Sequence, residues 1–174
     1  MPTIDATIGG ASANSYQSVS DSDTYFADRL NADDWSDDSA DNKARAKIMA
    51  TRRLNRENWY GARVTTTQAL AWPRIGVLKP DGSAGFGLGN YYGFGECYLD
   101  TEIPDLVKQA ENELALAYLQ GFSDDEGDAI EEFQESGGMR VRFRQSRPDG
   151  VLPATVTRLI SPLLAGSITL VRGS

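Results

Sequence analysis

Apolar residues recur at intervals of three and four along much of the chain, which is the spacing of amphipathic helices. A first helix is expected to start after Ser20, which can cap free backbone amides, and to run to about Leu30. A second is expected from Ser39 or Asp41 to about Asn58. Its predicted buried stripe has four main members, which are Ala44, Ile48, Thr51 and Leu54. Lysines and arginines are expected to cover the rest of that helix, Lys47 among them.

Three further helices are expected towards the C-terminus. The clearest begins after Pro104, because proline suits the first helical turn, and it ends at Gly121. It is predicted to be a core helix without chemistry. A short acidic helix within residues 124–135 and a last helix over residues 153–165, bent or ended by Pro162, complete the set.

Strict alternation over residues 139–144 predicts a strand. Arg140, Arg142 and Arg144 share one face of this strand. They could meet the acidic helix just before them, or they could form a row that faces another subunit or DNA.

Residues 78–100 form a glycine-rich insertion, and four of its aromatic residues are Phe86, Tyr91, Tyr92 and Phe94. The glycine spacing does not match a nucleotide-binding loop, and no Gly-Lys-Ser/Thr follows. Long loops in compact domains are usually functional or disordered. We expect these aromatics to contact a partner protein, since tyrosine and phenylalanine offer large contact areas.

The resulting fold class is mainly α. We expect a small bundle of four to five helices with a short β element at about 139–145, the glycine-rich loop and an extended C-terminal arm. An N-terminal arm (1–19), either frayed or ordered on a neighbouring subunit, precedes the helical domain (20–165). The apolar tail (166–174) could pair with the strand of its own subunit or add to a sheet edge of another protein.

Charge is strongly segregated in the first third of the chain. Asp21 to Asp41 holds eight aspartates and one arginine, whereas Lys43 to Arg56 holds six basic residues and no acidic one. The two runs could bridge each other within one subunit, or join an acidic face of one subunit to a basic face of the next. A third interpretation is a helix that tracks phosphates. The net charge of −8 opposes general binding to nucleic acid.

The residue inventory excludes several classes of chemistry. With no histidine and the single Cys97, catalytic triads built on histidine, zinc sites of cysteine and histidine, and internal disulfides are all excluded. The carboxylates lie mainly in solvent-like runs, so we expect neither an enzyme nor a bound cofactor. No signal-peptide pattern or apolar run of about 20 residues is present, which predicts a soluble protein made in the cytoplasm and no membrane partner.

Four sequence elements together resemble the head–tail adaptor (head completion) proteins of tailed bacteriophages, over roughly residues 12–170. They are Asn14-Ser15-Tyr16, Trp59-Tyr60-Gly61-Ala62-Arg63, Gln68-Ala69-Leu70-Ala71-Trp72-Pro73-Arg74, and the helix that starts at Ile103-Pro104. Trp59 and Trp72 are most simply wedges in the core. Many members of this family are labelled DnaT-like single-stranded-DNA-binding proteins.

The resemblance implies a structural virion protein, made in the host cytoplasm. It would assemble as a dodecameric ring between the portal protein and a downstream tail, tail-terminator or nozzle protein, and would extend the channel through which double-stranded DNA passes. The family's portal-docking segment maps onto Ile168, Thr169, Leu170, Val171 and Arg172. The glycine-rich insertion is longer than the family pattern.

The alternative function is a single-stranded-DNA-binding replication protein. Six arginines would carry that role, or an inter-subunit contact, and they are Arg52, Arg53, Arg56, Arg140, Arg142 and Arg144.

Overall fold

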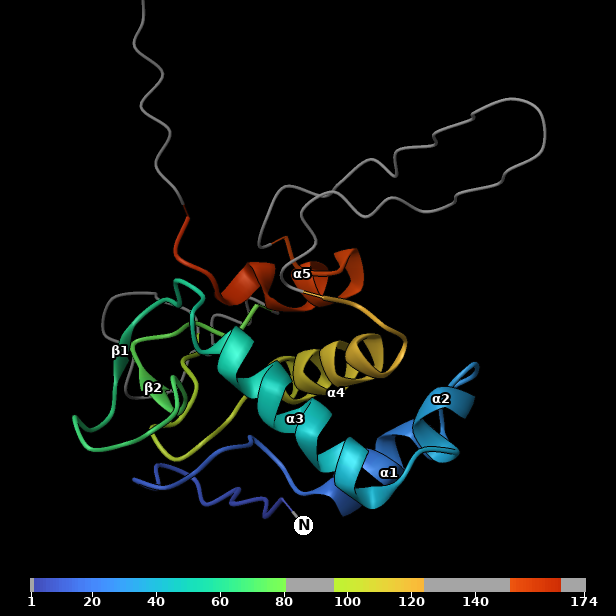
Figure 1. Cartoon of the computed structure of the whole chain (residues 1–174). Helices are drawn as coiled ribbons and strands as arrows, with labels where there is room; N and C mark the ends of the chain where they lie inside the picture. Colours follow the sequence, from blue (N-terminus) through green and yellow to red (C-terminus); the bar gives the residue numbers. More distant parts are fainter. Residues whose placement is uncertain (1, 81–95, 124–150, 167–174) are drawn as a thin grey trace, which may run out of the picture.

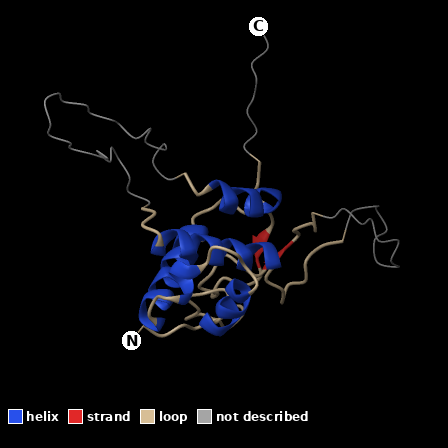
Figure 2. Cartoon of the chain, turned by 90° about the vertical axis from the view of Figure 1, so that its right-hand side faces the viewer, coloured by secondary structure: helices blue, strands red, loops and turns tan. Residues whose placement is uncertain are grey.

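The structure, a computed structural model, describes residues 2–80, 96–123 and 151–166. It is mainly helical with a small antiparallel sheet, which confirms the predicted fold class (Figures 1 and 2). The described elements are α1 (Val19–Ala27), α2 (Asp33–Ser36), α3 (Ala40–Leu54), β1 (Ala62–Arg63), β2 (Arg74–Ile75), α4 (Asp105–Leu119), α5 (Ala154–Ile160) and the 3-10 helix η1 (Ser161–Leu163). The predicted strand at 139–145, the acidic helix at 124–135, most of the glycine-rich insertion and residues 167–174 lie outside the described ranges.

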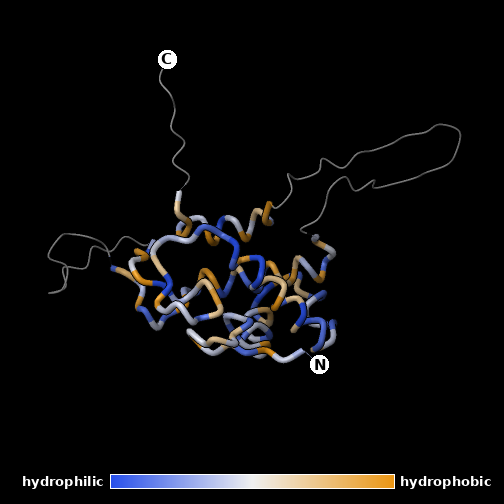
Figure 3. The backbone as a smooth tube through the Cα atoms, turned by 60° about the vertical axis from the view of Figure 1, so that its left-hand side comes forward, coloured by the Kyte–Doolittle hydropathy of each residue, from blue (hydrophilic) through white to orange (hydrophobic). Residues whose placement is uncertain are grey.

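Helices α3 and α4 pack against each other at the centre of the described fold. Helix α5 covers α4 on another side, α1 contacts α3, and α2 contacts α4 (Figure 1). Hydrophobic and hydrophilic residues alternate along the backbone of these helices (Figure 3), and the buried hydrophobic core draws residues from all five described α-helices. No helix within the described ranges has the length and apolar character needed to cross a membrane.

Helix α4 begins directly after Pro104, as predicted, and it is buried around most of its circumference. Val107, Ala110 and Leu114 are completely buried, which confirms the expected core face. Its polar residues Glu111 and Asn112 are also buried, although the predicted core face contained neither of them. The reason is that α3 and α5 enclose α4 from different sides.

Helix α1 starts two residues earlier than predicted, because Ser18 rather than Ser20 is its cap. The Ser18 Oγ accepts from the Asp21 amide at 3.1 Å, and the Asp21 carboxylate accepts from the Ser18 amide at 3.0 Å. The Ser18 hydroxyl also donates to the Asp21 carboxylate at 2.6 Å. The hydrogen bonds that this carboxylate accepts from the Ser18 side chain and amide hold the pKa of Asp21 below its ordinary value. The helix ends at Ala27 rather than near Leu30 and is followed by a turn in which Asn31 has a φ of 57°.

The acidic segment after α1 contains a one-turn helix, α2, rather than a loop. Trp35 at its centre is 1% exposed, and its ring lies 4.6 Å from that of Phe26. The Trp35 Nε1 donates to the Asp23 carboxylate at 2.8 Å. The surrounding aspartates therefore remain outside while the indole fills the core.

The buried arc of α3 is wider than the predicted stripe. Ala44, Thr51 and Leu54 are buried as expected, and Ile48 is partly buried. Ala46, Lys47 and Ala50 are buried as well, so the prediction that Lys47 lies on the polar surface is wrong. Helix α3 is enclosed by α1, α4 and the N-terminal segment, which cover more of its surface than a single neighbour would.

The described N-terminal segment lies against its own domain rather than extending away from it. The Asp5 amide donates to the Asn14 Oδ1 at 2.8 Å, and Tyr16 is 2% exposed. At the other end, the Tyr60 amide donates to the Leu163 carbonyl at 3.0 Å, and Ala165 donates to the Asn58 carbonyl at 2.8 Å. The chain leaving η1 is thereby held beside the segment that follows α3.

Strands β1 and β2 pair Ala62 with Ile75 and Arg63 with Arg74. Gly61 stands at the entry to this pair, after α3 has ended at Leu54 rather than at the predicted Asn58. Gly61 has a φ of 69°, and a Cβ at this position would lie 2.1 Å from the Ile75 carbonyl oxygen. Glycine is therefore required here by both conformation and space.

Replacing Gly61 with alanine should destabilise the protein by at least about 2 kcal/mol, because strain at positive φ is combined with a collision against backbone. Gly76 is the matched control. Its φ is 77°, but no atom lies within 4 Å of the position that an added Cβ would take. Gly76→Ala should cost only about 1 kcal/mol, and equal losses in urea unfolding would contradict the packing role of Gly61.

Candidate functional site

A group of buried polar side chains lies where the N-terminal segment, α1, α3 and α4 meet. We call it the buried polar centre, and it comprises Ser15, Ser22, Lys47, Thr51, Glu111 and Asn112. At its middle, the Lys47 Nζ lies 2.8 Å from the Glu111 Oε2, and both side chains are completely buried. The pair joins α3 to α4.

The second carboxylate oxygen of Glu111 is also fully engaged. Its Oε1 accepts from the Thr51 hydroxyl at 2.6 Å, the Ser15 hydroxyl at 2.7 Å and the Tyr16 amide at 2.9 Å. Charge-assisted hydrogen bonds of this kind are stronger than neutral ones. Glu111 therefore fixes the N-terminal segment to the α3–α4 pair.

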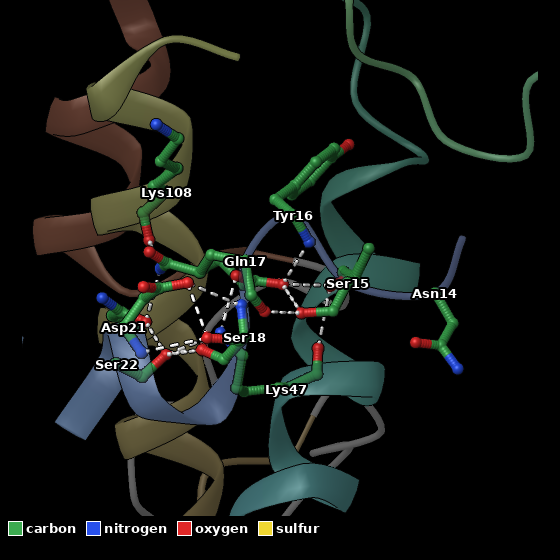
Figure 4. Close-up of polar contacts among 12 residues, drawn as sticks. Asn14, Ser15, Tyr16, Gln17, Ser18, Asp21, Ser22, Lys47 and Lys108 are labelled. Carbon is green, nitrogen blue, oxygen red and sulfur yellow. Dashed lines mark hydrogen bonds and ion pairs between the residues drawn. The ribbon is translucent and has the colours of Figure 1, made fainter. Parts of the chain in front are cut away.

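The ammonium group of Lys47 extends the network to α1. The Lys47 Nζ donates to the Ser22 hydroxyl at 2.7 Å, and that hydroxyl donates to the Asn112 Oδ1 at 2.7 Å. Gln17 completes the connection, because its Nε2 donates to the Asn112 Oδ1 at 2.8 Å and to the Lys108 carbonyl at 2.9 Å (Figure 4). Four separate segments of the chain thus meet through hydrogen bonds to two α4 side chains.

Burial lowers the pKa of Lys47 below its ordinary value, and the neighbouring Glu111 carboxylate opposes that shift. Removing two charges from water is costly, and it is repaid only when the pair has good geometry and its remaining hydrogen-bonding positions are satisfied. The contacts described above meet that condition for Glu111.

A second polar connection lies beside the buried polar centre. The Tyr16 hydroxyl donates to the Asn55 Oδ1 at 2.7 Å, and the same oxygen accepts from the Ala71 amide at 2.8 Å. Burial, together with the Glu111 charge, raises the pKa of Tyr16 above its ordinary value. Asn55 consequently ties the N-terminal segment and α3 to the loop between β1 and β2.

Gln68 and Arg74, the first and last residues of the Gln68–Arg74 sequence, hold that loop through hydrogen bonds to backbone carbonyls. The buried Gln68 side chain donates to the Leu70 carbonyl at 2.9 Å and to the Pro73 carbonyl at 3.1 Å. The Arg74 guanidinium donates to the carbonyls of Ala71, at 3.1 Å, and Gly61, at 2.7 Å, and also to those of Trp59 and Tyr60. Burial lowers the pKa of Arg74, and nearby Arg63 contributes.

Trp59 and Trp72 are core residues, as predicted. They are 5% and 0% exposed, and their rings meet edge to face with centroids 5.7 Å apart. Rings buried in this way cannot stack on nucleic-acid bases while the fold is intact.

The buried polar centre is therefore a structural feature rather than a reaction site. Its charged groups are enclosed and bonded to other protein groups, so they do not face a substrate. In the part of the chain that the structure describes, no three potential ligands among cysteine, aspartate and glutamate gather into a metal site.

The predicted site residues are only partly within the described ranges. Arg52 and Arg56 are exposed on α3 and just after it. Arg53 is partly buried and forms an ion pair with Glu57, so it does not share their exposed surface. The remaining predicted residues lie outside the described ranges, and they are Phe86, Tyr91, Tyr92, Phe94, Arg140, Arg142, Arg144, Ile168, Thr169, Leu170, Val171 and Arg172.

The structure adds two surface residues, Arg45 and Met49, to the predicted Arg52 and Arg56. Arg45, Met49, Arg52 and Arg56 are exposed along α3 and its C-terminal end at intervals of four, three and four, and we call them the α3 stripe. The helical spacing was available as a signal. The predicted buried stripe already implies that these positions face outward, whereas the burial of Lys47 depends on its partner Glu111 on α4.

These features define a small helical protein whose polar core holds four chain segments together and whose accessible charges lie outside that core. The chain belongs to the family described as "Putative DnaT-like ssDNA binding protein", which matches residues 3–173. No curated protein and no solved structure shows a significant match.

Breaking the Lys47–Glu111 pair should be among the most destabilising single changes in the protein. Lys47→Met and Glu111→Gln should each lower the free energy of unfolding by about 3–5 kcal/mol, because each leaves a buried group without its partner. The double variant should lose less free energy of unfolding than the two single variants added together, since it leaves no isolated charge.

The matched control is the exposed pair Lys108–Asp105, whose side chains are 37% and 84% exposed. Lys108→Met should change stability by no more than about 0.5 kcal/mol in the same denaturant titration. Additive losses in the Lys47 and Glu111 cycle would show that the two charges do not depend on each other.

Proposed function

We propose that this protein is a structural component of a tailed-phage particle, a head–tail adaptor that forms a ring between the portal and the tail. In this role it would extend the channel for DNA and perform no catalysis. Its proposed partners are the portal protein, a downstream tail protein and further copies of itself.

The first support is the resemblance of nearly the whole chain to that family, together with what the resembling residues do. Ser15 and Tyr16 bond to Glu111, Gly61 permits a close backbone approach, and Arg74 binds four carbonyls. These residues specify a fold rather than a binding surface. The resemblance therefore supports the proposal through the fold that these elements specify, and not through a binding surface.

The observation that carries the proposal is charge. The chain has a net charge of −8, and eight aspartates lie between Asp21 and Asp41. A channel through which DNA slides must not hold the phosphates, and acidic protein surfaces repel them. The same charge is unfavourable for a protein whose task is to retain single-stranded DNA.

Single-stranded-DNA binding is the second candidate function, and the description of the family favours it directly. The described residues that could serve it are Arg45, Arg52 and Arg56 of the α3 stripe. Met49 interrupts this row, and Trp59 and Trp72 are unavailable for stacking. Proteins that bind single strands usually combine a basic groove with accessible aromatic platforms.

Antibody labelling of purified phage particles tests the adaptor proposal. Under negative-stain electron microscopy, label should appear at the head–tail junction. A truncated protein lacking residues 167–174 should still fold but should fail to attach to the portal. Particles that contain none of this protein would refute the proposal.

A salt titration of oligonucleotide binding tests the second function. We expect no retention of a single-stranded oligonucleotide on filters, even at low salt. Tight binding that weakens steeply with salt, and that Arg52→Glu/Arg56→Glu abolishes, would instead establish the DNA-binding function. Arg158→Glu, an exposed change on α5, is the control for the loss of positive charge at an unrelated place.

A further inference from the structure

The most exposed large hydrophobic side chain among the described residues is Leu30, which is 86% exposed. It does not lie on a loose segment. The Arg29 Nη1 donates to the carbonyls of Leu30 and Asn31, each at 3.3 Å. Arg29 also pairs with Glu113 of α4, with Nε 2.8 Å from Oε1 and Nη2 2.8 Å from Oε2.

Glu113 is itself held, because the Tyr25 hydroxyl donates to its Oε1 at 2.8 Å. Burial and this hydrogen bond raise the pKa of Tyr25 to about 12. The turn that carries Leu30 is thus anchored to the core through Arg29 and Glu113, while the leucine side chain projects outward. A single exposed leucine is ordinary on a protein surface, so the case for a contact at Leu30 depends on the charges around it.

Leu30 is flanked in the chain by acids that have no partner among the described residues. Asp28 and Asp33 are exposed, and neither side chain forms a hydrogen bond or ion pair with another described residue. We call Asp28, Leu30 and Asp33 together the Leu30 knob. It has an apolar centre and an acidic rim.

The α3 stripe has the opposite charge and a similar arrangement. Met49 at its middle is 48% exposed. Arg52 and Arg56 form no hydrogen bond or ion pair through their side chains within the described ranges, and Arg45 has only a distant, exposed ion pair with Asp41 at 3.9 Å besides a hydrogen bond to Asn42. Interfaces commonly place an apolar contact inside a rim of complementary charges.

One subunit cannot bring these two surfaces together by itself. The α1–α2 region lies at the beginning of α3, where the Lys43 Nζ is 3.2 Å from Asp23 and 5.5 Å from the centre of the Trp35 ring. Arg52 and Arg56 lie near the other end of α3, towards β1 and β2 (Figure 1). From Lys43 to Arg52 the helix rises by roughly 14 Å.

We propose that the Leu30 knob of one copy docks onto the α3 stripe of a second copy. The contact joins two different surfaces, so repeating it produces a ring if the rotation closes. This inference rests on the proposed assembly role and names the surfaces that would carry it. A nucleic acid on the α3 stripe would leave Met49 and the Leu30 knob without a partner, which is why a protein occupant is favoured.

Cysteine cross-linking between separate chains tests the contact even when it is transient. Cys97→Ser is introduced throughout, because Cys97 is exposed. A Leu30→Cys chain mixed with a Met49→Cys chain at high concentration should give a disulfide-linked dimer on oxidation with diamide, since a disulfide requires Cβ atoms about 4 Å apart. Leu99→Cys is the matched control for Leu30→Cys, because Leu99 is also a leucine in a loop and is 65% exposed.

Charge reversal tests the rim. Arg52→Glu/Arg56→Glu in the Met49→Cys chain should lower the yield of linked dimer by about tenfold, because like charges then face each other. Asp28→Lys/Asp33→Lys in the Leu30→Cys chain should restore it. Circular dichroism and denaturant unfolding confirm that each variant is folded.

Equal yields from Leu30→Cys and Leu99→Cys would overturn the proposal. It would also be overturned if the arginine reversal abolished binding of a single-stranded oligonucleotide and left the cross-link unchanged, which would assign the stripe to nucleic acid. If antibody label appeared at the head–tail junction but this cross-link did not form, the proposed interface would be refuted and the adaptor role would stand. If the cross-link formed but the protein were absent from phage particles, the contact between copies would stand and the adaptor role would be refuted.

Discussion

The fold depends on one enclosed ion pair, Lys47 with Glu111. Two charges completely removed from water are tolerable only if each finds its partner and the surrounding hydrogen-bonding positions are filled. That requirement sets the position of α3 against α4, because the Nζ and Oε2 atoms must lie 2.8 Å apart. It also determines where the N-terminal segment runs, since Ser15 and Tyr16 supply hydrogen bonds that the carboxylate would otherwise lack. A purely apolar core would also stabilise the helices, but it would fix the position of α3 against α4 less narrowly.

This constraint explains the sequence elements by which the chain is recognised. Asn14, Ser15 and Tyr16 close the N-terminal segment over Glu111, and Asn55 connects Tyr16 to the loop that carries Trp72 and Arg74. Arg74 in turn holds the carbonyls around Gly61. The recognisable residues therefore form one continuous internal structure. They account for the internal fold, and the identity of a partner must be sought in the exposed residues around them.

Sequence reasoning predicted the helices well where an apolar period coincided with a clear start or stop, as in the helix after Pro104. It also placed Trp59 and Trp72 in the core. It failed where a tertiary partner decided the outcome. Lys47 lies among five other basic residues, and its charge led to a surface prediction although it is spaced three residues from Ala44 and four from Thr51 of the predicted stripe. Its partner is 64 positions away. The cap of α1 was misplaced by two residues because Ser18 and Ser20 are both good caps and each has an aspartate three residues later, Asp21 and Asp23. In the structure it is Ser18 that forms the capping box, with Asp21. Strands of two residues, such as β1 and β2, are too short to produce an alternating pattern.

Some exposed side-chain charges have no counterpart among the described residues. Asp28 and Asp33 stand at one end of α3, and Arg52 and Arg56 at the other, and no described residue neutralises either group. Exposed charges separated by more than about 10 Å are largely screened from one another at ordinary salt, so the two groups contribute little to each other within one subunit. Each has a rigid support, α3 for the arginines and the turn anchored by Arg29 for the acids. Opposite charges held rigidly but apart favour contact between copies, because only a second molecule can bring them within reach.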